Sequence, residues 1–290
     1  MSLADLATIE AALAASEAQV PGLRAGCEKR IIWAAAPATR TKTAVVFIHG
    51  FSATAEELRP LPDLVAEGLK ANLHFTRLTG HGQDGAALGR ATLADWRKDV
   101  AEALEVGQTI GERVIVIGCS TGCTLATLAL VDGAQIAGMV HVSPNFGLAH
   151  KVVQTLVDLP FARHWVWLVA GRTRRFPAQS PEHEKYWTLR YPTTAVHTMA
   201  DAVRAARKAD LSRVTTPALF CFNEKDQVVS AEATRAVIAR WGGPVDTVDL
   251  VQTDEDDAMG HIMAGNIFSP GQTLPLSRRI LAWSNRLPTG

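Results

Sequence analysis

The 290-residue chain has little cysteine, and this scarcity excludes one common kind of site. Its four cysteines, at positions 27, 119, 123 and 221, form no paired C-x-x-C motifs, so a structural zinc site is not expected. Cys119 and Cys123 are instead expected to be small packing residues. This use of cysteine fits a reducing compartment, and we expect a cytoplasmic protein.

An excess of charge and a long apolar run are also missing. The chain has 29 basic and 29 acidic residues, so charge gives no reason to propose nucleic acid or an anionic membrane as a partner. No apolar run approaches the ~20 residues that a membrane-spanning helix needs. The N-terminal MSLADLATIEAALAASEAQ lacks a basic n-region and carries acids within its apolar pattern. It is therefore interpreted as an amphipathic helix rather than a signal peptide.

What is present is an alternation of short apolar runs and helix-like segments. Strands are predicted at 29–34, 43–50, 73–79, 113–118, 138–143, 217–223 and 246–251. Helices are predicted at 54–70, 92–110, 121–132, 230–240 and 273–287. Apolar strands that alternate with helices predict an α/β fold with a mostly parallel sheet and helices on both faces.

One long interval, residues 145–212, interrupts this alternation. It contains no convincing strand, and its helix-like stretches lie around 150–170 and 195–209. Since a structureless loop of this length is unusual in a compact domain, we predict a helical insertion that lies over the sheet. The predicted organisation is an N-terminal helical extension (1–27), a first core part (28–144), a helical cap insertion (145–212) and a second core part (213–290).

The segment VIVIGCSTGCTLATLAL, residues 114–130, contains a G-x-S-x-G pattern between a predicted strand and a predicted helix. This is the pattern of a nucleophile elbow, in which a serine adopts a strained conformation and needs small residues on either side. Gly118 and Gly122 meet that need around Ser120. The glycines could also serve only to bend the chain, so the pentapeptide needs support from elsewhere in the sequence.

A second glycine follows the predicted strand at 43–50. In His49-Gly50-Phe51, Gly50 allows close approach of the backbone, so the Phe51 N–H is predicted to join the Thr121 N–H as an oxyanion hole. Thr121 begins the helix after Ser120, whose positive dipole end also favours developing negative charge. His49 itself is expected to have a structural role.

An acid and a histidine follow Ser120 in the order that a Ser-Asp-His triad requires. Asp226 lies just beyond the predicted strand at 217–223, and His261 is the only histidine after it. The acidic run at 254–257, directly before His261, offers alternative orienting carboxylates. Asp226 is preferred because it follows a strand, and the run is interpreted as a solvated loop.

With these residues the chain resembles the α/β-hydrolase superfamily, and within it the serine esterase, monoacylglycerol lipase and lysophospholipase-like branch. The resemblance covers about residues 28–287 and depends on VVFIHGF, RLTGHGQD, VIVIGCSTG, PALFCFNEKDQVV and MGHIMAGN. It implies an α/β-hydrolase fold with the cap at 145–212. One departure is Asn223, which stands where the family commonly has glycine.

These features predict a serine hydrolase that cleaves a short- to medium-chain or monoacylglycerol-like ester through Ser120, Asp226 and His261. No metal or organic cofactor is implied, and the expected partner is a small acyl substrate; the oligomeric state is left open. Candidate acyl-pocket residues are Phe146, Trp165, Trp167 and Trp187. Tryptophans in short helices also pack a cap onto a core. The arginines at 172, 174 and 175 are interpreted as a solvated face, with contact to an anionic group as the alternative.

Other functions remain as alternatives. Residues 80–85, GHGQDG, match a G-x-G-x-x-G dinucleotide motif, but they follow the third predicted strand rather than the first. The same fold also supports ligand receptors and scaffolds with little turnover. Thioesterases, amidases, acyltransferases and C–C hydrolases use the same triad.

Overall fold

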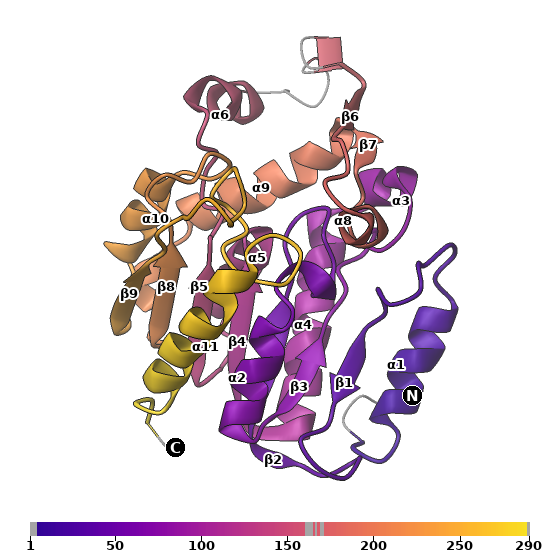
Figure 1. Cartoon of the computed structure of the whole chain (residues 1–290), viewed down its shortest axis with the longest axis vertical. Helices are drawn as coiled ribbons and strands as arrows, with labels where there is room; N and C mark the ends of the chain where they lie inside the picture. Colours follow the sequence, from indigo (N-terminus) through magenta and orange to yellow (C-terminus); the bar gives the residue numbers. More distant parts are fainter. Residues whose placement is uncertain (1–4, 160–164, 166, 169–170, 289–290) are drawn as a thin grey trace.

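The computed structural model describes residues 5–159, 165, 167–168 and 171–288, and it has a central sheet with helices on both faces and a cap above (Figure 1). The sheet has seven strands in the order β1-β3-β2-β4-β5-β8-β9. Only β1 runs antiparallel to its neighbour, and the other pairs are parallel. The predicted fold class, an α/β hydrolase with a mostly parallel sheet, is confirmed.

The strands lie on the predicted apolar runs, with ends that differ by a few residues. They are β1 (Arg30–Ile32), β2 (Thr41–Ile48), β3 (Asn72–Phe75), β4 (Gly111–Cys119), β5 (Gly138–Val142), β8 (Ala218–Phe222) and β9 (Val245–Asp249). In the middle of the sheet, Ile117 of β4 pairs with Phe47 of β2 and Val140 of β5. Such strands are buried on both faces, which explains their nearly continuous apolar sequence.

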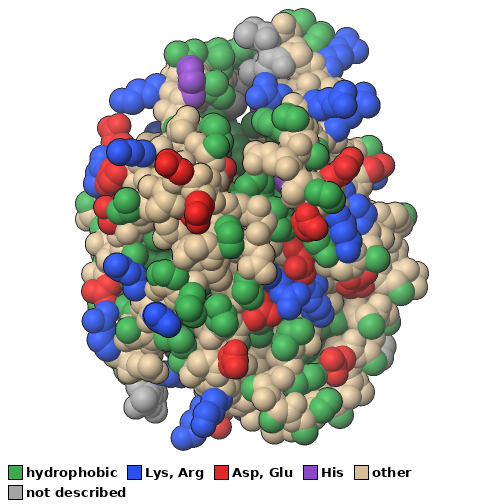
Figure 2. Space-filling view, viewed as in Figure 1, with side chains coloured by type: hydrophobic (Ala, Val, Ile, Leu, Met, Phe, Trp, Pro, Cys, Tyr) green, Lys and Arg blue, Asp and Glu red, His purple; other side chains and the backbone are tan. Residues whose placement is uncertain are grey.

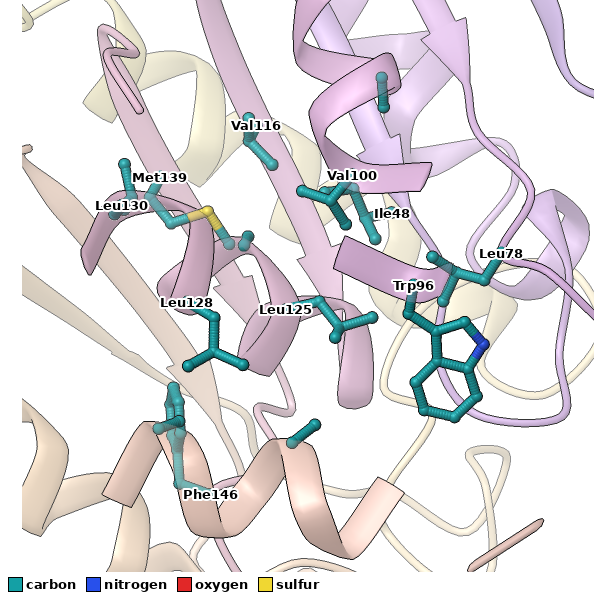
Figure 3. Packing of buried hydrophobic residues seen from close by; sticks show 14 of the residues in the cluster. Ile48, Leu78, Trp96, Val100, Val116, Leu125, Leu128, Leu130, Met139 and Phe146 are labelled. Carbon is teal, nitrogen blue, oxygen red and sulfur yellow. The ribbon is translucent and has the colours of Figure 1, made fainter. Parts of the chain in front are cut away.

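Alternate residues of each central strand pack on opposite sides of the sheet. Val46 and Ile48 of β2 belong to the core below α4 (Leu93–Ile110) and α5 (Thr121–Val131). Their neighbours Val45 and Phe47 pack on the other side, toward α2 (Leu61–Leu69) and α11 (Pro270–Ser284). Helix α10 (Ala231–Ile238) joins the first side. Figure 3 shows Trp96, Val100 and Leu125 of α4 and α5 in this first cluster.

The helix predicted over 54–70 is interrupted, so that prediction was wrong in part. A short 3₁₀ helix, η1 (Ala55–Glu57), comes first, and α2 begins only at Leu61. The physical reason is Pro60, which has no N–H to continue a helix, followed by Pro62 in the first turn of α2. Glu57, the last residue of η1, is buried.

The predicted N-terminal helix is present as α1 (Ile9–Ala18) and lies beside β1. Ile9 and Leu13 pack with Ile31 in a small core of their own. Glu17, 5% exposed, forms a buried ion pair with Arg77 through hydrogen bonds of 2.7 and 2.8 Å. Burial alone would raise the pKa of Glu17, but Arg77 and Lys29 together lower it.

Between β5 and β8 the chain forms the cap, here named for residues 145–212. It contains α6 (Lys151–Asp158), α8 (Pro181–Tyr186), α9 (Thr194–Lys208) and η2 (Leu211–Arg213). It also contains two strands, β6 (Thr173–Arg175) and β7 (Arg190–Pro192), which pair antiparallel. The expectation of no strand was therefore wrong. Each strand has three residues and β6 is fully exposed, so neither carries an alternating apolar pattern.

Helix α9 crosses the upper end of the sheet and packs against α5 (Figure 1). Its buried residues include Ala195, Met199 and Val203. Parts of the helix-like stretch predicted at 150–170 (160–164, 166 and 169–170) lie outside the described residues, as do residues 1–4 of the predicted extension. The division of the chain into core and cap domains stays a prediction. Among the described helices, none is both long and apolar enough to cross a membrane.

Candidate active site

Ser120 lies at the sharp turn between β4 and α5. Its backbone has φ 49° and ψ −114°, a conformation that residues other than glycine rarely adopt. A Cβ on Gly122 would stand 2.1 Å from the carbonyl oxygen of Ile48, and one on Gly118 would stand 2.8 Å from the Cys123 nitrogen. The close approach of helix and strands therefore requires both glycines, for the reason expected from the sequence.

The structure brings Ser120, His261 and Asp226 together in one chain of hydrogen bonds. His261 Nε2 lies 3.1 Å from Ser120 Oγ, and His261 Nδ1 lies 2.7 Å from Asp226 Oδ2. The second oxygen of Asp226 accepts the N–H groups of Val228 and Val229 at 2.7 and 2.9 Å. Because the carboxylate accepts the Nδ1 proton, Nε2 is left as the acceptor for the serine hydroxyl.

The environment of His261 favours its protonated form. Burial alone would lower the pKa of His261, but the charge and hydrogen bond of Asp226 raise it, and the charges of Glu57 and Asp257 raise it further. The net shift is upward from the ordinary value of 6.5. This is the direction needed by a base that must hold a proton briefly after taking it from a buried hydroxyl.

Within the acidic run before His261, one residue has a structural role in the site. Asp257, 6% exposed, accepts the backbone N–H groups of His261 and Ile262 at 3.0 and 2.9 Å. Asp257 therefore holds the backbone of this loop, while Asp226 contacts the imidazole ring. Asp254 and Glu255 are exposed.

Asn223, the departure noted in the sequence, links the acid loop to the histidine loop. Its Nδ2 donates to the carbonyl of Gly260 at 3.1 Å, and its Oδ1 accepts the N–H of Lys225 at 2.9 Å. A side chain at this position thus makes contacts that a glycine would not. The sequence showed that Asn223 replaces the usual glycine, but it did not predict the contacts of the Asn223 side chain.

The loop at residues 49–51 borders the serine. A Cβ on Gly50 would stand 3.1 Å from Ser120 Cβ, so the glycine allows a close approach of this loop to the serine. Thr121 is the first residue of α5, and the first N–H groups of a helix have no partner within it. These positions are consistent with the predicted oxyanion hole of Phe51 and Thr121, whose role stays a prediction.

His49 holds this loop in place through hydrogen bonds of its ring. It is fully buried; its Nε2 accepts the Leu78 N–H at 3.1 Å, and its Nδ1 donates to the Gly50 carbonyl at 2.9 Å. Burial lowers the pKa of His49 to about 4, so the ring is neutral. The structure thus assigns His49 the kind of structural hydrogen bonds that were expected.

Glu57 was missed by the sequence analysis. It is 2% exposed, and its Oε2 accepts the Gly50 N–H at 2.6 Å. Burial raises the pKa of Glu57 to about 7, although the Gly50 hydrogen bond and the charge of His261 oppose the rise. The only sequence signal was an acid within a segment predicted as an amphipathic helix, which is ordinarily a solvated position.

The aromatic residues proposed for an acyl pocket occupy different environments. Phe146 is fully buried in the core, with its ring 5.9 Å from that of His141. Trp187 packs against His183 and Phe268 at ring distances of 5.2 and 5.4 Å. Trp165 and Trp167 are half-buried, and Arg172 lies over the Trp167 ring. A substrate-binding role for these four residues stays a prediction. The arginines at 172, 174 and 175 are exposed.

In the GHGQDG loop, other segments of the protein pack directly against the glycines. A Cβ on Gly85 would stand 2.0 Å from the carbonyl oxygen of Arg190, and one on Gly82 would stand 2.7 Å from Cys27 Cβ. Asp84 caps the short helix α3 (Gly85–Arg90) by accepting the Ala87 N–H. These contacts explain the glycines by close packing between core, cap and N-terminal segment, without a dinucleotide.

All four cysteines are free and buried. No group of three or more His, Cys, Asp or Glu side chains suited to a metal ion occurs in the part of the chain that the structure describes.

The family follows from a comparison of this sequence with known families. The model of the alpha/beta hydrolase family matches residues 45–265, which include all three members of the hydrogen-bond chain. The chain belongs to this family. Its resemblance to the esterase and lipase branch of this family is also confirmed.

Relatives with known sequences and structures agree with this placement. A thermostable monoacylglycerol lipase from Bacillus sp. (strain H-257) is 26% identical over 191 residues, which are 64% of this chain and 71% of that protein. A structure from work on LipS and LipT, two metagenome-derived lipolytic enzymes, matches with TM-score 0.71 and 18% identity over 91% of this chain and 99% of that one. Paleococcus ferrophilus monoacylglycerol lipase matches with TM-score 0.63 and 15% identity over 88% and 97%. At these identities the two structures show the shared fold.

Proposed function

We propose that this hydrolase cleaves carboxylic esters through an acyl-enzyme on Ser120. The observation that carries the proposal is the continuous chain from Ser120 Oγ through His261 to Asp226, with separations of 3.1 and 2.7 Å. A buried serine beside an oriented imidazole is the arrangement that activates a hydroxyl as a nucleophile.

In the proposed reaction, His261 takes the Ser120 proton as the hydroxyl attacks the ester carbonyl. Asp226 keeps the imidazole in the required tautomer and stabilises the imidazolium. The oxyanion accepts hydrogen bonds from the N–H groups of Phe51 and Thr121, and losing one such donor typically costs about 3 kcal/mol. His261 then protonates the leaving alcohol, and water attacks the acyl-enzyme by the same route in reverse.

The proposed substrate is a short- to medium-chain or monoacylglycerol-like ester. Support comes from the relative in Bacillus, whose name identifies a monoacylglycerol lipase. The surface is also hollowed below the cap, and hydrophobic side chains are visible there (Figure 2). A series of p-nitrophenyl esters and monoacylglycerols of increasing chain length tests this part. Equal kcat/KM across the series would contradict an acyl pocket.

The first test is labelling with a fluorophosphonate probe, followed by mass mapping of the adduct. We expect wild type to be modified at Ser120, and Ser120→Ala to be unlabelled and to lose kcat by more than about a thousandfold. Ser143→Ala is the matched control, because Ser143 is also buried and also has a positive φ, of 47°. It should label like wild type.

Absence of labelling in folded wild type, or retention of ester hydrolysis in Ser120→Ala within tenfold of wild type, would contradict the proposal. The first outcome would favour a ligand receptor on the same fold.

A further inference from the structure

A buried carboxylate below the candidate active site has no part in the reaction described above. Glu57 ends the 3₁₀ helix η1 and is 2% exposed. An acid in such a place destabilises the fold unless its oxygens are hydrogen-bonded. One of its oxygens accepts the Gly50 N–H at 2.6 Å. The reason for a glutamate at this position must therefore lie in the contacts of its carboxyl group.

The geometry connects Glu57 with the loop that borders the serine. A Cβ on Gly50 would stand 2.7 Å from Glu57 Oε1 and 3.1 Å from Ser120 Cβ. The carboxyl group of Glu57 and the side chain of Ser120 thus both lie close to Gly50. Phe51, whose N–H is the proposed oxyanion donor, follows Gly50 directly. A shift of Gly50 would move that N–H relative to Ser120.

The backbone of Glu57, as distinct from its side chain, lies against the loop that carries the base. A Cβ on Gly265, four residues after His261, would stand 2.7 Å from the Glu57 carbonyl oxygen. Two other carboxylates act on the same histidine: Asp226 on the ring and Asp257 on the backbone N–H. Three groups act on the Glu57 carboxyl group and lower its pKa: the Gly50 N–H, the charge of His261 and the thiol of Cys119. Burial raises the pKa of Cys119, so this thiol is a neutral donor.

We propose that Glu57 is a positioning residue of this site, which holds residues 49–51 through the Gly50 N–H and stabilises protonated His261 through its charge. The inference rests on the proposed function, because it assigns Glu57 a part in the same acyl transfer. The Glu57 carboxyl group, whose pKa burial raises to about 7, is partly ionised near neutral pH, and its charge then favours the imidazolium that forms when His261 takes the serine proton. A fixed Gly50 keeps the Phe51 N–H in place before the oxyanion forms.

Two substitutions separate the two roles. Glu57→Gln keeps an oxygen that can accept the Gly50 N–H but removes the charge. Glu57→Ala removes both and leaves a buried N–H without its partner. The matched control is Glu56→Gln, the adjacent acid of η1, whose carboxylate pairs with Arg30 and Arg59 at 2.6 and 3.1 Å instead.

The electrostatic role is tested without turnover, by NMR titration of the His261 imidazole. We expect Glu57→Gln to lower the midpoint of the His261 titration by about half a pH unit or more. Glu56→Gln should leave it unchanged. A merely structural role would not move this midpoint in a folded variant, so an unchanged midpoint in Glu57→Gln overturns the electrostatic part. The NMR midpoint tests the electrostatic role of Glu57 even if wild type has no esterase activity. Absence of esterase activity would overturn only the proposed function.

The positioning role is tested by kinetics on the ester that wild type cleaves best. We expect Glu57→Ala to lower kcat about tenfold or more while KM changes less than about threefold, because a displaced N–H weakens the transition state more than substrate binding. Glu57→Gln should keep kcat at its pH optimum within about threefold and shift the acid limb of kcat/KM to lower pH. Wild-type kcat in folded Glu57→Ala would overturn this part. If Glu57→Ala does not fold, Glu57→Met, which keeps a long side chain but offers the Gly50 N–H no oxygen, takes its place in the same assay. An unshifted acid limb in Glu57→Gln overturns the electrostatic part.

Discussion

At the scale of single residues, two members of the candidate triad, Asp226 and His261, are oriented by neighbours that do not themselves react. The N–H groups of Val228 and Val229 fix the Asp226 carboxylate, and Asp257 fixes the backbone of His261. Sequence reasoning could name the reactive residues, because their types and order are constrained by the chemistry. It could not single out Asp257 within the acidic run or identify Glu57, because acids in a loop or short helix are usually solvated.

The pH dependence of activity follows from the environment of His261. The base must be neutral to accept the serine proton, and the surrounding carboxylates raise its pKa above 6.5. We therefore expect kcat/KM to rise with pH and the midpoint of this acid limb to lie above 6.5. Asp226→Asn should lower the midpoint as well as kcat, since Asp226 makes the largest contribution that raises this pKa. A pH profile measured on one ester checks both, and a wild-type midpoint at or below 6.5 would contradict the assignment.

At the scale of elements, the parallel sheet explains why residues distant in sequence meet. Strands β2, β4 and β8 run parallel, so the segments that follow their carboxyl ends lie at one edge of the sheet. Gly50, Ser120 and Asp226 follow these three strands. The strands were predictable because burial on both faces demands continuous apolar runs. The cap strands β6 and β7 were not, because each has only three residues and β6 is wholly exposed.

The junction of β4 and α5 gives a prediction at this scale. Gly122→Ala would place a Cβ 2.1 Å from the Ile48 carbonyl oxygen, so strand and helix would have to separate. We expect the free energy of unfolding to fall by about 1–3 kcal/mol or more, and kcat to fall with it. Urea denaturation and ester hydrolysis measure the two effects.

Gly271→Ala in α11 is the control for that substitution. A Cβ at Gly271 would meet no atom within 4 Å, and the helix would exchange glycine for a better helix former. Its stability should be unchanged or higher by up to about 1 kcal/mol. If Gly122→Ala behaved in the same way, the close approach at the elbow would have no energetic importance.

At the scale of the whole molecule, segments from both ends of the chain complete the structure around the core. Helix α11 covers one face of the sheet with α2, and α1 packs beside β1. The cap meets the core near the candidate site. The Thr188 N–H donates to the Ser52 carbonyl at 2.7 Å, and the rings of Tyr191 and Phe51 are 5.2 Å apart. Movement of the cap would thus displace the loop next to Ser120.

The ion pair between Glu17 and Arg77 gives a prediction for the N-terminal segment. Glu17→Gln would leave the Arg77 guanidinium, 7% exposed, without its main partner. Losing one partner of a buried pair typically costs about 3–5 kcal/mol of unfolding free energy. We expect the lower end here, because Asp99 and Glu102 also act on Arg77. Urea denaturation measures the loss, and Glu10→Gln, an exposed acid of the same helix, should change stability by less than about 0.5 kcal/mol.

The pH dependence of this contribution has a definite sign. The pKa of Glu17 is lower in the folded protein than its ordinary value of 4.5. Its stabilisation is therefore fully present above pH 4.5 and is lost as the pH falls through the lowered value. The difference in stability between wild type and Glu17→Gln should shrink in acid. A constant difference from pH 7 to pH 3 would show that the pair does not contribute through its charge.

The sequence by itself determined the α/β class and the candidate residues Ser120, Asp226 and His261. It did so because burial, turn geometry and the order of the triad each restrict residue types locally. Only the tertiary structure decided which acid contacts the imidazole ring, why residues 80–85 need glycine, and that Glu57 lies beneath Gly50. These contacts join segments far apart in the chain, and no local pattern records which distant group will desolvate or pair with a given side chain.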